Sequence, residues 1–350
     1  MADILTGREM ADHPIYRIYS MTKPIVSAVA VMLMEEGKLR LGTPVAAILP
    51  EFSAMEVLEE NGTRRKAATV MTLDHLLTHR SGLSYGFLDD CPVGQIYAAE
   101  AGRLWEGAEL GPVISRYAEL PLAFDPGAEW RYSIATDVVG RILEVVEGKP
   151  LGQILGERVF EPLGLTDTGY VVPESERGRV MAMFGEANID ETLAARSGAQ
   201  QLTPVEDIPG YPMDDPAFAR GGHGLFSTLQ DYVRIARFLA DGKADDGTAL
   251  VSRKGIEALW ANRIPDGLYP MRLGPISLAG YGYGLGGRVM IKPGEFAGFS
   301  TVGECGWAGA ASTYFWIDPA EDLIGVVMTQ YLGSTIPLGD DMRNAVYQAL

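Results

Sequence analysis

Ten residues without a charge, 25–34 (Ile-Val-Ser-Ala-Val-Ala-Val-Met-Leu-Met), lie close to the start of this 350-residue chain. Glu35-Glu36-Gly37 follows them and provides a polar end with a helix-stopping glycine. A helix that is apolar on every side must be enclosed by the rest of the protein. The run is too short to cross a bilayer, so it predicts a buried core helix around which the fold is built.

Ser20 and Lys23 come directly before this helix, three residues apart. That spacing places both side chains on one face of the first turn. A serine beside a lysine at the start of a buried helix can act as a nucleophile with its proton acceptor. No other serine in the chain has a lysine three residues later. The alternative is that Ser20 only caps the helix and that Lys23 is solvated.

Lys23 can accept the proton of Ser20 only when its amine is neutral. With a starting pKa near 10.4, a neutral lysine at pH 7 costs roughly 4.6 kcal/mol. Burial and a nearby positive charge or helix dipole can supply much of this free energy, and a tyrosine can share the proton transfer. Tyr132, in 130–134 (Trp-Arg-Tyr-Ser-Ile), is the candidate. Alone it would more simply be a packing residue, because the chain has 15 tyrosines.

The segment 305–311 (Cys-Gly-Trp-Ala-Gly-Ala-Ala) is rich in small residues. Small residues on a strand let its backbone approach a ligand closely. Such a strand beside the nucleophile can direct a backbone N–H at a developing oxyanion. The alternative is a strand, weakened by glycine, that only packs against the core helix.

Composition excludes several classes of protein. A net charge of −17 argues against nucleic acid and anionic membrane surfaces as partners. The four histidines form no HExxH or Cys/His cluster, so we expect no metal and no cofactor. Cys91 and Cys305 are too few for a disulfide framework. No basic and apolar leader opens the sequence, so a cytoplasmic location is expected.

The order of predicted elements favours an α+β fold, in which helices flank an antiparallel sheet and a second lobe is mostly helical. We expect the sandwich lobe at 1–45 and 275–350 and the helical lobe at 46–274. The predicted elements are a strand at 15–19, helices at 73–78, 133–146, 151–160 and 228–240, a long loop at 172–224, strands at 281–291, 300–304, 307–317 and 323–330, and a helix at 342–350.

The chain resembles the serine β-lactamase/penicillin-binding-protein superfamily, in its class C β-lactamase-like branch. The resemblance is carried by the Ser20–Lys23 pair, the segment around Tyr132 and the segment 305–311, in this order. Within that branch the chain looks most like the family VIII carboxylesterases, so a β-lactamase/transpeptidase-like fold is implied. No Gly-x-Ser-x-Gly elbow is present, which argues against an α/β-hydrolase. Further segments that carry the resemblance are 16–25, 35–39, 76–83, 126–133, 224–228 and 318–319.

The resemblance implies a role for each candidate residue. Ser20 would be the acylated nucleophile, Lys23 its proton acceptor, and Tyr132 the shuttle to the leaving group. The backbone N–H groups of Ser20 and Ala310 would form the oxyanion hole. His79 belongs to the family pattern at 78–82 and is expected to be structural. His223 lies in a glycine loop, where we expect it to pack, the alternative being that it reaches the cleft.

Two departures from the β-lactamase pattern concern the substrate. Ile134 stands where that pattern has an asparagine that binds the amide of a β-lactam, and isoleucine cannot bind it. Trp307-Ala308-Gly309 replaces Lys-Thr-Gly, so an apolar wall replaces a lysine that attracts a carboxylate. Ile134, Trp307 and Gly309 are therefore the expected substrate-binding residues.

Hydrolysis of a small uncharged carboxylic ester through acyl-Ser20 is the predicted function. The ester is the expected partner, with no nucleic acid and no membrane, and the oligomeric state is left open. The alternatives are a β-lactamase or D-Ala peptidase, an acyltransferase of the same superfamily, and a catalytically silent member. Relatives carry a helix and strands before the part that matches 5–19. Only 19 residues precede Ser20 here, so we expect either that the chain start is misassigned or that the protein is truncated.

Overall fold

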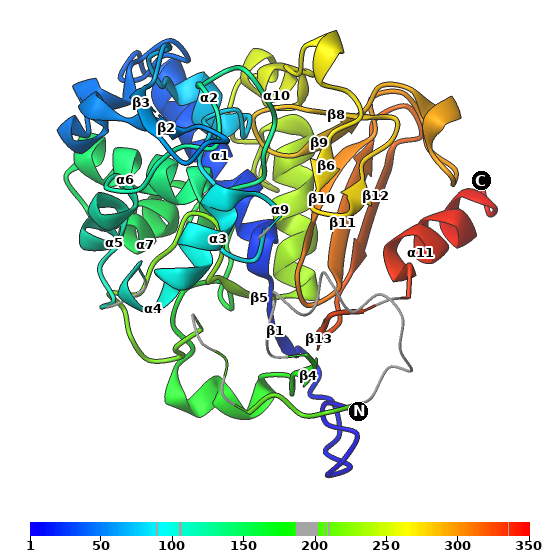
Figure 1. The fold of residues 1–350 in the computed structure, drawn as a ribbon. Coiled ribbons are helices and arrows are strands. Elements are labelled where there is room, and N and C mark those ends of the chain that lie inside the picture. The colour runs from blue at the N-terminus through cyan, green and yellow to red at the C-terminus, as the bar shows by residue number, and fades with distance from the viewer. Residues whose placement is uncertain (89, 105–106, 187–201, 207, 209–210, 335) are drawn as a thin grey trace.

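Helix α1 (Lys23–Glu35) is the buried core helix that the apolar run predicted. In the computed structural model, all of its residues from Lys23 to Leu33 are buried. It crosses the middle of the molecule and contacts α6, α7, α9 and α10 (Figure 1). The structure describes residues 1–88, 90–104, 107–186, 202–206, 208, 211–334 and 336–350.

Helices α6 and α9 have 13 residues, like α1, and the other elements are shorter. The helices are α2 (Leu73–Leu77), α3 (Pro92–Ala99), α4 (Ala101–Leu104), α5 (Leu110–Tyr117), α6 (Ala135–Glu147), α7 (Leu151–Leu155), α9 (Leu229–Asp241), α10 (Arg253–Trp260) and α11 (Leu338–Tyr347). The strands are β1 (Ile15–Arg17), β2 (Glu56–Leu58), β3 (Arg64–Lys66), β4 (Phe184–Gly185), β5 (Phe226–Thr228), β6 (Arg272–Leu273), β7 (Ile276–Ser277), β8 (Tyr281–Tyr283), β9 (Arg288–Met290), β10 (Cys305–Gly309), β11 (Thr313–Asp318), β12 (Leu323–Val327) and β13 (Tyr331–Leu332).

The main sheet has five antiparallel strands in the order β12-β11-β10-β9-β8. Helix α9 packs against β11 and β12 from one side, and α11 contacts β12 from the other (Figure 1). This arrangement confirms the α+β prediction. Strand β10, which carries the small residues, is the central strand of the five.

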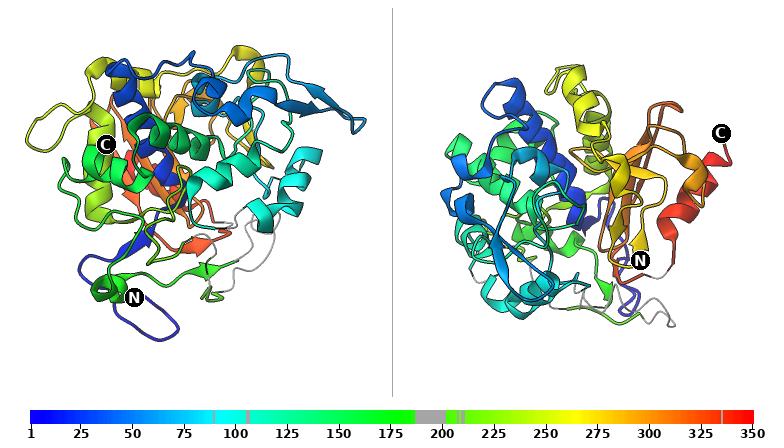
Figure 2. Two further views of the ribbon diagram at one scale, coloured as in Figure 1. Left: turned by 90° about the vertical axis from the view of Figure 1, so that its left-hand side faces the viewer. Right: turned by 45° about the horizontal axis from the view of Figure 1, so that its top comes forward.

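The helices α2 to α7 lie on the far side of α1 from the sheet (Figure 2). They are held by the same core cluster that includes α1. Helices α9 and α10, which fall inside 46–274, contact α1 as well as each other. The division into lobes at 45 and 275 stays a prediction.

A short two-stranded sheet places the nucleophile segment. Strand β1 pairs antiparallel with β5, with Arg17 opposite Phe226. The chain then enters the 3₁₀ turn η1 (Tyr19–Thr22) and continues directly into α1. Tyr19 has φ +44°, and its N–H donates to the Tyr211 hydroxyl at 2.6 Å. The side chain of Tyr211 therefore holds an unfavourable backbone angle directly before Ser20.

Several predicted boundaries were wrong. The stretch 281–291 is the hairpin β8–β9, and 307–317 is divided between β10 and β11 by a turn in which Ser312 has φ +59°. The stretch 300–304 is no strand, because the Glu304 N–H donates to the Thr301 carbonyl and closes a turn.

The other predicted helices and the loop differ less. The helix expected at 133–146 begins at Ala135, the one at 151–160 changes to a π-turn at 156, and the last begins at Leu338. The expected loop 172–224 contains the 3₁₀ turn Glu174–Arg179 and β4, and 187–201, 207 and 209–210 of it lie outside the described residues. Among the described residues no helix combines the length and apolar character needed to cross a membrane.

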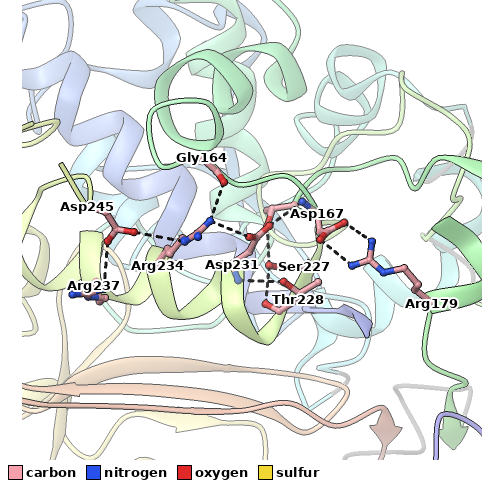
Figure 3. A network of polar contacts seen from close by, with 10 residues as sticks. Gly164, Asp167, Arg179, Ser227, Thr228, Asp231, Arg234, Arg237 and Asp245 are labelled. Atoms are coloured by element: carbon pink, nitrogen blue, oxygen red, sulfur yellow. Dashed lines mark hydrogen bonds and ion pairs between the residues drawn. The ribbon is translucent and has the colours of Figure 1, made fainter. Parts of the chain in front are cut away.

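A polar network around Asp231 fastens the segment after α7 to the start of α9 (Figure 3). Asp231 Oδ2 accepts hydrogen bonds from the Asp167 N–H at 2.9 Å and the Thr168 hydroxyl at 3.0 Å. The Asp231 N–H donates to Thr228 Oγ1 at 3.2 Å, which caps α9. Arg179 pairs with Asp167 and extends the network to the following segment. Strand β5 is thereby held where it pairs with β1.

We predict that Asp231→Ala lowers the free energy of unfolding by about 1–3 kcal/mol, because it removes the acceptor that two half-buried donors, the Asp167 N–H and the Thr168 hydroxyl, share. Urea denaturation measures this change. Arg237→Ala is the control, since Arg237 lies on the same helix and makes only an exposed ion pair with Asp245. Its expected cost is about 0.5 kcal/mol or less. Equal costs for the two variants would contradict the anchoring role of Asp231.

Candidate active site

Ser20 and Lys23 meet at the junction of η1 and α1, as their spacing predicted. The Lys23 amine donates to Ser20 Oγ at 3.1 Å. Lys23 is only 1% exposed, whereas Ser20 is half-buried. A reactant from solvent can therefore reach the hydroxyl, while the amine behind it is shielded from water. This is the geometry that a serine nucleophile with a lysine base requires.

The Lys23 amine has two further partners that the sequence analysis missed. It donates to the Tyr85 hydroxyl at 3.1 Å and to the Gly222 carbonyl at 2.8 Å. Tyr85 comes two residues after 76–83, one of the segments that carry the family resemblance. The residues around Tyr85 form no motif that would predict a contact with Lys23. A carbonyl group has no sequence signature at all. Burial raises the pKa of Tyr85 well above its usual value, so its hydroxyl is neutral at pH 7.

Tyr132 lies beside Lys23 but presents its ring. The amine is 4.6 Å from the centroid of this ring. The hydroxyl oxygen of Tyr132 accepts a hydrogen bond from Trp307 Nε1 at 3.3 Å. Among the described residues, no hydrogen bond joins the Tyr132 hydroxyl to Ser20 or Lys23. The shuttle role of Tyr132 therefore stays a prediction, supported by its closeness to the amine.

The end of β10 comes close to the turn that carries Ser20. A Cβ atom at Gly309 would lie 2.5 Å from the Ile18 carbonyl oxygen and would also collide with Thr313. Only glycine permits this approach. Ala310 follows and packs against the hydrophobic cluster that contains Tyr19. This closeness supports an oxyanion hole formed by the N–H groups of Ser20 and Ala310, which stays a prediction.

The expected substrate-binding side chains lie in different environments. Trp307 packs against the rings of Tyr132 and Tyr283, with centroids at 5.5 and 5.2 Å. It therefore adds to the aromatic wall beside the amine. Ile134 is completely buried in the main core, where it precedes α6. A substrate contact by Ile134 stays a prediction.

The two histidines near the site are neutral at pH 7. Burial, with the charge of Lys23 nearby, lowers the pKa of His79 well below its usual value. Its Nδ1 lies 3.2 Å from Ser133 Oγ and its ring packs on Tyr132, as expected of a structural residue. Burial and Arg220 lower the pKa of His223 to about 3. Both rings are therefore uncharged near neutral pH.

Metal ligands do not gather at this site. In the described part of the chain, no group of three or more His, Cys, Asp or Glu side chains could hold a metal ion. The two cysteines are free, with Cys305 buried on β10 and Cys91 half-buried before α3.

Comparison with known proteins identifies the family. The model of the Beta-lactamase family matches residues 1–349. The chain belongs to this family. Its sequence is 30% identical over 358 residues to esterase EstB from Burkholderia gladioli, covering 99% of this chain and 86% of the relative.

A second relative agrees with this assignment, and a solved structure has the same fold. The lovastatin esterase of Penicillium rubens is 30% identical over 343 residues, covering 92% of this chain and 80% of the relative. Among solved structures, EstCE1, described as a hydrolase with promiscuous acyltransferase activity, superposes with a TM-score of 0.80 at 23% identity. It covers 99% of this chain and 88% of its own, and it supports the fold.

We predict that Gly309→Ala slows acylation of Ser20 about 10²-fold, because the added Cβ pushes β10 away from the nucleophile turn. The rate of labelling by a fluorophosphonate probe measures this. Gly294→Ala is the control, since a Cβ atom there meets nothing within 4 Å. A Gly309→Ala variant that is labelled as fast as the unmodified protein would show that the close approach of β10 is not needed.

Proposed function

We propose that this β-lactamase-family protein is a serine hydrolase that cleaves small uncharged carboxylic esters through an acyl-Ser20 intermediate. The observation that carries the proposal is the hydrogen bond between the half-buried Ser20 hydroxyl and the buried Lys23 amine. The esterase relatives support the same reaction class. A small-molecule ester is the only partner that the proposal requires.

Acylation begins with Lys23 in its neutral form. A neutral amine has two N–H groups, which suffice for the Gly222 carbonyl and the Tyr85 hydroxyl, so its lone pair is left for the Ser20 hydroxyl 3.1 Å away. As Ser20 Oγ attacks the ester carbonyl carbon, its proton moves to Lys23. The carbonyl oxygen becomes an oxyanion, which the N–H groups of Ser20 and Ala310 stabilise.

The leaving alcohol then needs a proton. Trp307 donates to the Tyr132 oxygen, so the hydroxyl proton of Tyr132 is directed elsewhere and is available to the alcohol. Tyr132 regains a proton from Lys23, whose amine lies next to its ring. Water then attacks the acyl carbon while the same groups accept its proton, and the acid leaves with Ser20 restored.

The surroundings of the amine favour an uncharged substrate. Trp307 and Tyr283 present aromatic surface beside Tyr132. Trp307 occupies the place of the lysine in the Lys-Thr-Gly pattern, so the wall lacks a cation that would attract a carboxylate. Ile134 likewise offers no hydrogen bond to an amide.

The decisive variant is Ser20→Ala. It removes the atom that is acylated, so we expect turnover of a short-chain nitrophenyl ester to fall roughly 10³-fold or more. Ser175→Ala is the control, because Ser175 is exposed and bonds only to neighbouring Glu176. Undiminished turnover in the Ser20 variant would remove the proposal.

Three further measurements separate the alternative functions. Faster turnover of nitrocefin or of a D-Ala-D-Ala peptide than of esters would indicate a β-lactamase or peptidase. An added alcohol that outcompetes water for the acyl group would indicate an acyltransferase. Absence of fluorophosphonate labelling at Ser20 would indicate a catalytically silent protein.

A second variant tests the hydrogen bond to Tyr132. Trp307→Phe keeps the aromatic wall but removes the donor, so we expect kcat/KM for the ester to fall about 3- to 10-fold. Trp260→Phe is the matched control, because it removes an indole donor that bonds to the Leu239 carbonyl. If Trp307→Phe keeps full activity, Trp307 serves only as a wall.

A further inference from the structure

The peptide unit of Gly222 lies between the Lys23 amine and a buried carboxylate. Its carbonyl accepts from Lys23 at 2.8 Å, and its N–H donates to Asp137 Oδ1 at 3.0 Å. The carboxylate and the amine thus act on the two ends of one amide. A hydrogen bond to a carboxylate polarises that amide and strengthens its carbonyl as an acceptor.

Asp137 is an unusual residue in the first turn of α6. It is 1% exposed, and its Oδ2 atom has no hydrogen-bond partner among the described residues. A Cβ atom on Gly222 would lie 2.6 Å from this oxygen and 2.8 Å from the Tyr85 hydroxyl. Asp137 Oδ2 and the Tyr85 hydroxyl, which accepts a hydrogen bond from Lys23, therefore lie on the same side of Gly222.

The charges around Asp137 and Lys23 come from several elements. Lys23 on α1 and Arg220 before the Gly222 loop are the cations that act on Asp137. Arg220 directs hydrogen bonds to the carbonyls of Ala108 and Ala219. Further titratable neighbours of Asp137 and Lys23 are neutral at pH 7: Tyr85, Tyr117, Tyr170, His79 and His223. Tyr132 also faces Lys23, with the amine 4.6 Å from the centroid of its ring.

We infer that Asp137 is a positioning residue for Lys23, which fixes the Gly222 carbonyl and supplies the negative charge that stabilises the ammonium formed when Ser20 loses its proton. This inference rests on the proposed function. Positive charge develops on Lys23 only as the oxyanion forms. A fixed carboxylate nearby favours that charge without rearrangement at the moment of reaction.

The carboxylate carries a cost for the folded state. Burial raises the pKa of Asp137 above its usual value, although Lys23 and the Gly222 N–H act in the opposite direction. The folded state therefore favours the protonated form of Asp137. The contribution of this group to the free energy of unfolding is fully present at pH values below its pKa in the unfolded chain, and it is lost as the pH rises through its pKa in the folded protein. At neutral pH a neutral isostere should be tolerated at least as well by the fold.

The test is Asp137→Asn, which keeps an acceptor for the Gly222 N–H and removes the charge. We expect kcat/KM for the ester and the rate of Ser20 labelling by a fluorophosphonate to fall about tenfold or more. The acidic limb of both pH profiles should move to lower pH, because the variant has no Asp137 carboxylate to protonate, whereas burial raises the pKa of that carboxyl in the unmodified protein. The Tm should stay equal or rise.

Glu147→Gln is the matched control. It removes one carboxylate from the same helix, but Glu147 faces Lys38 and Arg158. Its labelling rate and pH profile should equal those of the unmodified protein.

Three results would overturn the inference alone: an Asp137→Asn variant with unchanged rate and profile, one that fails to fold, or one whose Tm falls with its rate while the acidic limb stays in place. If the unmodified protein is not labelled at Ser20 at all, the proposed function falls and the inference with it.

Discussion

A lysine amine enclosed by the protein, with every donor engaged, is the feature on which the rest of this structure depends. Lys23 reaches Ser20, Tyr85 and the Gly222 carbonyl, which come from three separate parts of the chain. A buried amine without such partners would cost several kcal/mol. The fold must therefore bring these parts together before the amine can be buried, and the site is assembled by the same contacts that close the core.

The unfavourable backbone angle of Tyr19, directly before Ser20, is stabilised by a hydrogen bond from another part of the chain. Tyr19 keeps a left-handed backbone because its N–H is held by the Tyr211 hydroxyl, which also accepts from the Gly224 N–H. One phenol thus joins the turn that carries Ser20 to the loop that carries Gly222. The hydroxyl and the carbonyl on either side of the Lys23 amine are consequently fixed relative to each other.

The sequence predicted the local parts of the site well. The buried helix and the Ser20–Lys23 pair follow from periodicity and spacing over a few residues, which short-range geometry determines. Tyr85 and the Gly222 carbonyl were missed because their proximity depends on how distant loops pack. Asp137 had a weak signal, since it is an acid among apolar residues at the start of a predicted helix. The strand expected at 300–304 failed because turn hydrogen bonds override β-propensity.

On β10, Trp307 stands where the β-lactamase pattern has a charged lysine, and this replacement affects the chemistry of the site. Where a lysine would stand, Trp307 gives an indole N–H that bonds to the Tyr132 oxygen and an aromatic face beside it. A neutral donor can orient a phenol without attracting an anionic substrate. The negative charge of the site then lies behind Lys23, on Asp137, across one peptide unit. Charge is therefore placed where the amine becomes positive.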